Sequence, residues 1–264
     1  MKGRVAFVSG GTSGIGEACA RLFVENGARV VVTGRRQERL DAIARELGDA
    51  CHARPLDVRD AAQTARAFDD LPAPFAAVDV LVNAAGGAHG LEKAQSANLS
   101  DWDEMIASNV TGLVHLTRAA LPGMIARGRG HVVNLGSVAG SFPYPGGNVY
   151  GATKAFVERF SSNLRADLLG TPVRVTSIEP GMVETEFSVV RFRGDQAKAD
   201  AVYANMTPLA AADIADLILF AVTRPPHVNV NRLEVMPTDQ AFSPFAVHRD
   251  PARAKEAAEA NHQK

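Results

Sequence analysis

The chain has 264 residues, of which 46% are hydrophobic and 22% charged, and its formal net charge is −1. This balance is ordinary for a soluble domain and lacks the basic excess of nucleic-acid-binding proteins, so we expect no nucleic-acid partner. No apolar run approaches the ~20 residues that a membrane-spanning helix needs, and no signal-peptide pattern precedes the first apolar segment. The cytoplasm is therefore the expected compartment. Because the two cysteines form no CxxC pair and the seven histidines show no metal-binding spacing, neither a disulfide framework nor a metal site is expected.

Short runs rich in Val and Ile recur along the chain and are typical of strands buried on both faces of a sheet. In chain order they cover 4–9, 28–33, 78–83, 131–137 and 173–180, with weaker runs at 51–56 and 228–235. Helix-length stretches lie between them, at 14–26, 38–47, 60–70, 101–127, 150–169 and 211–222. This alternation predicts a single α/β domain over 1–249, a Rossmann-like, doubly wound parallel sheet with helices on both faces. The remaining 250–264 lack large apolar side chains, which predicts a polar C-terminal tail.

A glycine-rich turn, "SGGTSGIG", joins the first predicted strand to the first predicted helix. Gly10, Gly14 and Gly16 have the spacing GxxxGxG, close to the dinucleotide-binding fingerprint. Backbone N–H groups at the start of such a helix can bind a pyrophosphate, and the hydroxyls of Thr12 and Ser13 add donors. The alternative is a glycine-rich turn without a ligand, which the flanking strand and helix make less favourable.

Two adjacent arginines, Arg35 and Arg36, follow the second predicted strand. In NAD-binding versions of this fold an acidic residue near this position accepts hydrogen bonds from the ribose 2′-hydroxyl. A carboxylate would repel a 2′-phosphate, whereas a guanidinium can bind one through two parallel hydrogen bonds. The pair therefore predicts NADP(H) as the cofactor. The alternative is that both are solvated surface residues, as we expect for Arg39.

Tyr150 and Lys154 are four residues apart at the start of a predicted helix and so share one face of it. A phenol has a pKa of ~10, and a neighbouring ammonium group favours its ionised form. Ser137 closes a predicted strand at the edge where parallel sheets bind ligands, and its hydroxyl could hold a substrate oxygen beside the phenol. Either motif alone is weak, since a serine can simply cap a strand end. Together they indicate acid-base chemistry on an oxygen.

With these residues in place, the sequence resembles the short-chain dehydrogenase/reductase family. The motifs that carry the resemblance occur in the family's order: "SGGTSGIG", "LDV" at 56–58, "NAAG" at 83–86, "SNVTG" at 108–112, Ser137, the YxxxK pair and "EPG" at 179–181. The resemblance covers most of the chain and implies one domain with about seven strands. It also implies that Tyr150 is the acid-base, that Ser137 orients the substrate oxygen, and that Lys154 lowers the tyrosine pKa and binds the nicotinamide ribose. Asn109 would hold a water that links Lys154 to solvent.

The same resemblance implies a set of cofactor-binding residues. Asp57 and Val58 would meet the adenine, Asn83 the adjacent ribose, and 180–187 the nicotinamide side. The full implied set is Gly10, Thr12, Ser13, Gly14, Ile15, Gly16, Arg35, Arg36, Asp57, Val58, Asn83, Ala84, Gly86, Tyr150, Lys154, Pro180, Gly181, Val183, Thr185 and Phe187. The family usually has NNAG where this chain has NAAG, so Ala84 would loosen hydrogen bonding at the strand end without removing a catalytic group.

A closer similarity, over about residues 4–249, is to the family's NADP-dependent 3-hydroxy acid dehydrogenases. It rests on segments such as "TGRRQERL", "GGNVYGATKAFV", "RVTSIEPGMVETEFS" and "HVNVN". That subgroup implies oxidation of short 3-hydroxy acids, or reduction of 3-oxo acids, and a homotetramer. Two alternatives stay open: an NADPH-dependent reductase of a ketoacyl thioester, sugar or secondary alcohol, and an NADP-sensing protein without chemistry.

An acidic substrate requires a cation in the pocket, because an unpaired buried charge is costly. Arg191 and Arg193 lie in the segment after the nicotinamide side, where lids over a substrate are common. If this segment is extended, the two side chains project the same way, and we expect Arg191 to bind the substrate carboxylate. The alternative is that both arginines form salt bridges with Glu184, Glu186 or Asp195.

Subunit contacts are expected on the two long helices at 101–127 and 150–169. Both carry more apolar side chains than one sheet face needs: Val110, Leu113, Val114, Phe156, Val157 and Phe160. Since the resembling family pairs subunits through these helices, a homotetramer with two-fold interfaces is predicted.

Overall fold

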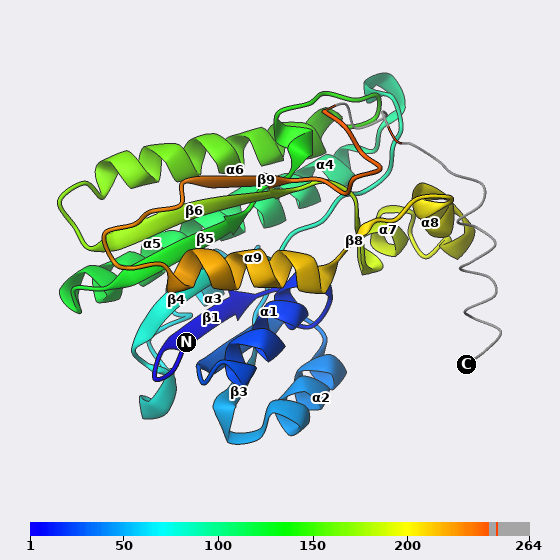
Figure 1. Ribbon diagram of the computed structural model, residues 1–264. Helices are drawn as coiled ribbons and strands as arrows, with labels where there is room; N and C mark the ends of the chain where they lie inside the picture. Colours follow the sequence, from blue (N-terminus) through cyan, green and yellow to red (C-terminus); the bar gives the residue numbers. More distant parts are fainter. Residues whose placement is uncertain (243–246, 248–264) are drawn as a thin grey trace.

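The computed structural model describes residues 1–242 and residue 247. A seven-stranded sheet forms its centre, with the order β3-β2-β1-β4-β5-β6-β9 and every neighbouring pair parallel (Figure 1). The strands are β1 (Val5–Ser9), β2 (Arg29–Gly34), β3 (Cys51–Pro55), β4 (Val78–Asn83), β5 (Gly130–Leu135), β6 (Val173–Pro180) and β9 (Arg232–Val235). The predicted doubly wound parallel sheet is confirmed. From β1 the chain adds β2 and β3 on one side and then crosses over to add β4, β5, β6 and β9 on the other, so the topological switch point lies between β1 and β4.

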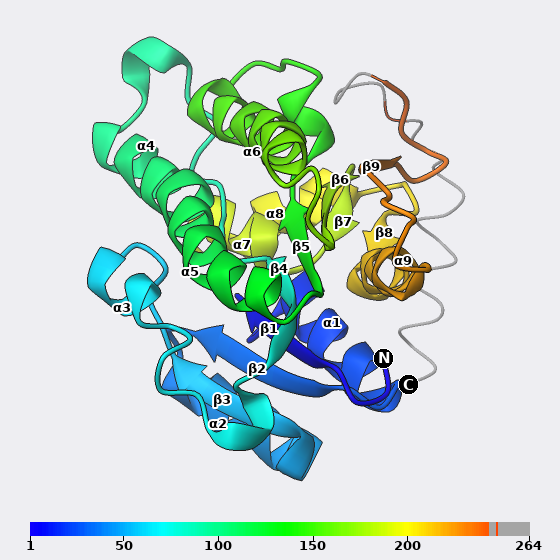
Figure 2. The same ribbon diagram turned by 90° about the vertical axis from the view of Figure 1, so that its left-hand side faces the viewer.

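Helices cover both faces of this sheet (Figure 2). One face carries α1 (Gly14–Glu25), α2 (Gln37–Leu47) and α9 (Ala211–Thr223), and the other carries α5 (Gly112–Ala126) and α6 (Asn148–Asp167). Successive side chains of a strand point to opposite faces, so Ala6 and Val8 of β1 pack in the first layer while Phe7 packs in the second. The core is thus divided into two layers by the sheet.

Two predicted helices differ from the structure in extent. The helix predicted at 60–70 is only α3 (Ala61–Ala65), which Asp60 caps through the N–H groups of Ala62 and Gln63. The helix predicted at 101–127 is three segments: α4 (Leu99–Ile106), a π-helical turn (Ala107–Thr111) and α5. Short 3-10 turns occur at Gly48–Ala50, Ala73–Phe75, Ala94–Ser96 and Val138–Gly140.

A small substructure between β6 and α9 has no counterpart among the predicted elements. It contains α7 (Glu186–Arg191) and α8 (Gln196–Tyr203), which pack together at one end of the sheet (Figure 1). Its two ends are joined by a parallel pair of short strands, β7 (Val183–Glu184) and β8 (Leu209–Ala210). The predicted tail at 250–264 lies outside the described residues. Over the described part of the chain, no helix is long and apolar enough to cross a membrane.

Candidate active site

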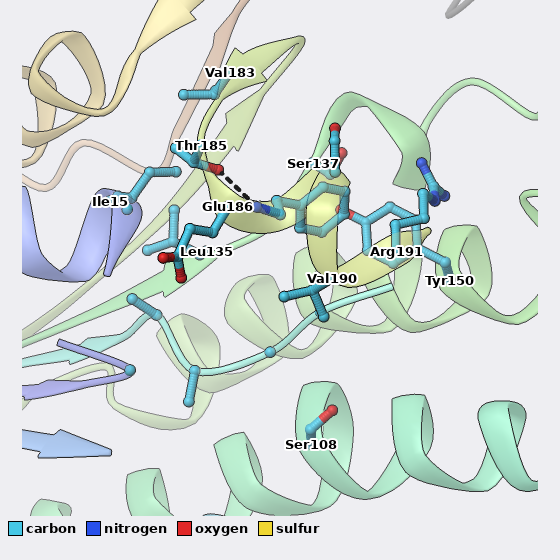
Figure 3. A pocket seen from close by; sticks show the side chains of 18 of the residues that line it. Ile15, Ser108, Leu135, Ser137, Tyr150, Val183, Thr185, Glu186, Val190 and Arg191 are labelled. Atoms are coloured by element: carbon cyan, nitrogen blue, oxygen red, sulfur yellow. Dashed lines mark hydrogen bonds between the residues drawn. The ribbon is translucent and has the colours of Figure 1, made fainter. Parts of the chain in front are cut away.

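A cavity of about 640 Å³ lies at the carboxyl ends of the central strands, under α7. This is the edge at which doubly wound sheets bind ligands, and the volume is typical of a small-molecule site. Figure 3 shows Ile15 and Thr185 toward one end of it and Ser137, Tyr150 and Arg191 grouped at the other. The cavity therefore brings the glycine-rich turn and the predicted catalytic group into one space.

The glycine-rich turn fits a pyrophosphate. Gly10 has a φ of 67°, and a Cβ there would lie 2.8 Å from the Ala85 backbone. A Cβ on Gly16 would lie 2.4 Å from the carbonyl oxygen of Gly10, so the turn closes this tightly only with glycine. Ser13 occupies the N-cap of α1 without capping it through its side chain. Backbone N–H groups at the start of α1 are therefore left to bind an anion in the cavity.

The three arginines after β2 have different partners. Arg36 donates to the Ser13 hydroxyl at 2.9 Å and to the Glu186 carboxylate at 3.0 Å. Arg39 also donates to Glu186, so the prediction that Arg39 is only a solvated residue is wrong. Arg35 is the most exposed of the three, and its guanidinium lies 3.6 Å from Glu104. Arg36 and Arg39 thus form the cationic pair nearest the turn.

The predicted adenine end of the cavity is a network of charged side chains. Arg59 binds Asp57 at 2.6 Å and Glu104 at 2.8 Å. Its hydrogen bond to Asp57 holds the pKa of that carboxyl group below its usual value. Asp57 and Val58 both line the cavity, as expected for residues that meet a base. The network fixes one wall of this end.

Ser137, Tyr150 and Lys154 line the opposite end. Lys154 is buried, donates to the Leu135 carbonyl at 2.7 Å, and lies 5.8 Å from the centre of the Tyr150 ring. β5 ends at Leu135, so Ser137 begins the following 3-10 turn, where its hydroxyl accepts from the Ala139 N–H at 3.1 Å. The three side chains converge as predicted, with the serine placed by a turn instead of a strand.

Burial controls the ionisation of this pair. It raises the pKa of Tyr150 to about 12, while the charge of Arg191 and a hydrogen bond from Ser137 oppose the increase. It lowers the pKa of Lys154 to about 8. Arg191 is thus a cation that favours the phenolate here, and the effect that the family resemblance gave to Lys154 stays a prediction. At neutral pH the pair is a neutral phenol beside an ammonium group.

Arg191 points into the cavity from the last residue of α7. Its guanidinium carbon lies 5.7, 5.2 and 5.5 Å from the ring centres of Tyr144, Tyr150 and Phe187, and it donates to the Tyr144 hydroxyl. Within the described part of the chain, its buried Nε has no hydrogen-bond partner. This leaves one donor of the fork for a ligand.

Arg193 does not share that direction. The segment is helical up to Arg191 and turns at Arg193, which has a φ of 55° and forms an ion pair with Asp101 at 2.5 Å. The premise of an extended segment is therefore wrong. For Arg193 the salt-bridge alternative is right in kind but not in partner, because the acid is none of the three that were expected.

Two predicted residues, Asn83 and Asn109, do not line the cavity. The Asn83 amide donates to Asn134 at 2.8 Å and Thr117 at 3.0 Å, inside the protein. Asn109 lies in the π-helical turn and bonds the Gly87 backbone at 2.9 Å through both its amide nitrogen and oxygen. Both asparagines support the walls of the site. The other predicted cofactor residues line the cavity: Gly10, Thr12, Ser13, Gly14, Ile15, Gly16, Arg35, Arg36, Asp57, Val58, Ala84, Gly86, Tyr150, Lys154, Pro180, Gly181, Val183, Thr185 and Phe187.

Among the cavity residues to which the sequence analysis gave no individual role are Tyr144, Glu186 and Tyr203. The Tyr203 hydroxyl bonds Ser188 of α7 at 2.7 Å and thereby joins α8 to α7. Tyr144, six residues before Tyr150, and Glu186, within 180–187, lie near motifs, but the motifs do not reveal their contacts. In the regions the structure describes, no cluster of His, Cys, Asp or Glu side chains could hold a metal ion.

Comparison with known proteins identifies the class to which this fold and cavity belong. The sequence model of the short chain dehydrogenase family matches residues 4–195. The chain belongs to this family and is an oxidoreductase.

Individual relatives match nearly the whole chain. An NADP-dependent 3-hydroxy acid dehydrogenase, YdfG, from Salmonella typhimurium is 54% identical over 246 residues, which are 93% of this chain and 99% of the relative. Sulfoacetaldehyde reductase 2 from Chromohalobacter salexigens is 53% identical over 249 residues, with coverage of 93% and 99%. Among solved structures, the closed form of a serine dehydrogenase complexed with NADP+ has 51% identity and a TM-score of 0.90, with coverage of 93% and 100%.

Proposed function

We propose that this chain is an NADP-dependent oxidoreductase that interconverts a short 3-hydroxy acid and the corresponding 3-oxo acid. The observation that carries the proposal is the grouping of Ser137, Tyr150 and Arg191 in one cavity, with the guanidinium 5.2 Å from the phenol ring. An acid-base and a carboxylate-binding cation are thereby close enough to act on the same small molecule. The names of the YdfG and serine dehydrogenase relatives support this substrate class.

The cofactor is proposed to lie along the cavity from Arg36 to Lys154. The glycine-rich turn would hold the pyrophosphate, the arginines after β2 the 2′-phosphate, and Asp57 and Val58 the adenine. Lys154 would bind the nicotinamide ribose and 180–187 the nicotinamide side. When bound, NADP(H) supplies or accepts the hydride.

Tyr150 is proposed to move the proton. Because burial holds its pKa at about 12, the phenol is protonated at neutral pH and can donate to the oxygen of a 3-oxo acid. Ser137 would hold that oxygen in place. In the oxidation direction the phenol must first lose its proton, so oxidation should accelerate as the pH rises. Asn109, whose amide also bonds Thr153 one residue before Lys154, is proposed to hold a water that links Lys154 to solvent.

Arg191 is proposed to bind the acid group of the substrate. Its Nε is buried beside Tyr150, and a carboxylate there would give this donor a partner. A sulfonate has the same charge and three acceptor oxygens, so the site also suits a sulfonated aldehyde. The sulfoacetaldehyde reductase relative specifically favours this second candidate.

A substrate screen with purified protein tests the proposal. NADPH consumption would be followed with malonic semialdehyde, sulfoacetaldehyde, a ketoacyl thioester, a sugar and a neutral ketone, and NADP+ reduction with serine and 3-hydroxypropionate. We expect the highest kcat/KM among the short acids. A preference for a thioester, sugar or neutral ketone would contradict the proposed substrate class and support a reductase with another carbonyl substrate. Binding of NADPH without turnover of any substrate would indicate a sensor.

We further propose a homotetramer in the cytoplasm. The rings of Phe156 and Phe160 in α6 stack with centres 5.8 Å apart; Phe156 and Ile106 are exposed, whereas Phe160 also packs against the core. Leu113 and Val157 are buried in the core of the chain itself, so the prediction that they contribute to a subunit interface is wrong. The exposed apolar side chains of α4 and α6 remain a fitting surface for a second copy.

A further inference from the structure

Glu186 belongs to the segment proposed for the nicotinamide side, but its carboxylate reaches the arginines after β2, which are proposed to hold the 2′-phosphate. Its Oε2 accepts from Arg36 at 3.0 Å and its Oε1 accepts from Arg39. Arg36 also bonds the Ser13 hydroxyl at 2.9 Å, so the carboxylate sits beside the glycine-rich turn. Two guanidinium groups, one hydroxyl and one anion therefore form a closed cluster.

The two guanidinium groups and the hydroxyl form an anion-binding site, and the Glu186 carboxylate occupies it. A carboxylate and a phosphate both accept pairs of hydrogen bonds from guanidinium groups, so they compete for the same donors. Hydrogen bonds from Arg39 and then Arg36 hold the pKa of Glu186 below its usual value, so the carboxylate is ionised at neutral pH. The three charged side chains are 40 to 44% exposed, so a solvated phosphate can reach them.

We propose that Glu186 is a specificity-determining residue that competes with the 2′-phosphate for Arg36 and Arg39. Arg39 is then the second phosphate ligand, and binding of the 2′-phosphate releases Glu186 from both arginines. The proposal rests on the proposed NADP dependence. A dianionic phosphate can displace a single carboxylate from two cations, whereas the 2′-hydroxyl of NAD(H) cannot.

Glu186 also couples the two ends of the cavity. It is the first residue of α7, and the same helix carries Phe187 and Arg191 beside Tyr150. Exchange of Glu186 for a phosphate therefore frees the start of the helix whose last residue is the proposed substrate ligand. The residue proposed to select the cofactor and the arginine proposed to bind the substrate thus lie at opposite ends of the same short helix, α7.

Calorimetric binding of adenosine 2′,5′-bisphosphate and of 5′-AMP tests this without turnover. Glu186→Gln should bind the bisphosphate about three- to tenfold more tightly than wild type, a range set by the solvent exposure of the ion pairs. Its affinity for 5′-AMP should stay within about twofold. Arg39→Leu should weaken the bisphosphate by roughly tenfold or more with little effect on 5′-AMP. Glu38→Gln, which changes an exposed acid two residues from Arg36 that does not line the cavity, is the matched control and should match wild type.

The outcomes separate the two proposals. If wild type binds the bisphosphate no better than 5′-AMP, the NADP assignment itself fails. If wild type prefers the bisphosphate but Glu186→Gln binds it equally or more weakly, Glu186 does not compete and only holds the arginines in position. If Arg39→Leu leaves the bisphosphate affinity unchanged, Arg39 is not a phosphate ligand.

Discussion

Burial moves the pKa values of Tyr150 and Lys154 in opposite directions, away from each other. The phenol is raised to about 12 and the ammonium group is lowered to about 8. Below about pH 8 the site therefore holds a proton on both groups, which suits donation to a carbonyl. With Tyr150 as the proposed acid-base, this protonation state favours the reduction of a carbonyl at neutral pH.

Replacing Tyr150 with Phe removes only the hydroxyl. Turnover should fall by well over tenfold while NADPH affinity stays close to wild type, because the ring and its contact with Phe187 remain. Steady-state kinetics and a fluorescence titration with NADPH measure the two quantities. Retention of more than about a tenth of kcat, a barrier change under ~1.4 kcal/mol, would contradict the acid-base role.

Arg191 and Arg193 offer a matched pair of substitutions. Arg191→Leu should raise KM for a 3-hydroxy acid by well over tenfold and leave an uncharged secondary alcohol nearly unchanged, because only the acid uses the guanidinium. Arg193→Leu, which loses the ion pair with Asp101 outside the cavity, should leave both KM values near wild type. If Arg191→Leu affects both substrates alike, the side chain is structural and the acid group is held elsewhere.

The residues of the site were predictable where a local motif places them. The glycines, Ser137, Tyr150 and Lys154 follow strands or start helices, so their positions could be derived from local pattern. The pairing of Glu186 with Arg36 could not be found in this way, because the two residues are 150 positions apart along the chain. Arg191 was predicted in the cavity from an extended segment that is in fact helical, so its position was anticipated on a wrong structural premise.

At the scale of single elements, the buried strands were the most predictable feature. Strands covered on both faces are apolar throughout, and 78–83 agrees with β4 at both ends. Short elements were missed or misjudged because they depend on distant contacts. α8, for instance, is tied to α7 by a tyrosine hydroxyl, which no periodicity reveals.

β5 carries a histidine that should make stability depend on pH. His131 is buried, bonds Thr176 at 2.7 Å, and burial followed by the charges of Arg174 and Arg4 holds its pKa well below the usual value. The unfolded chain therefore binds a proton near pH 6.5 that the folded chain does not. The resulting stability is present above pH 6.5 and is lost as the pH falls, by at most ~1.4 kcal/mol per pH unit.

Thermal unfolding between pH 5 and 7.5 measures this effect. His131→Gln lacks the titrating group, so its Tm should decline less on acidification than that of wild type. Equal declines in the two proteins would show that other groups dominate acid unfolding.

At the scale of the whole molecule, the sheet order brings segments from distant parts of the chain to one edge. β1 and β4 lie side by side at the centre, and the cavity opens at this topological switch point. This arrangement could be predicted, since alternating strands and helices allow few other topologies. The assembly of subunits leaves a weaker trace in the sequence, because core and interface side chains are equally apolar.

Light scattering at micromolar concentration should give the mass of a tetramer of the 27.9 kDa chain. Phe156→Asp should shift the protein toward smaller species, because it places a charge on the exposed apolar surface of α6. A monomeric wild type would contradict the proposed assembly. An unchanged mass for Phe156→Asp would place the interface on another surface.

The parallel pairing of β7 with β8 has a consequence for how such proteins diversify. Val183 pairs with Leu209, so the two ends of the segment that carries α7 and α8 lie side by side. Because the two ends of this segment are paired, the residues between them can be exchanged, lengthened or shortened without changing the distance that the chain must span or displacing the central sheet. The proposed proton-transfer residues, Ser137 and Tyr150, lie outside this segment, in the turn after β5 and on α6, whereas Arg191 lies within it. A new substrate preference should therefore be obtainable by exchanging the continuous segment 183–210 alone, with the rest of the domain unchanged.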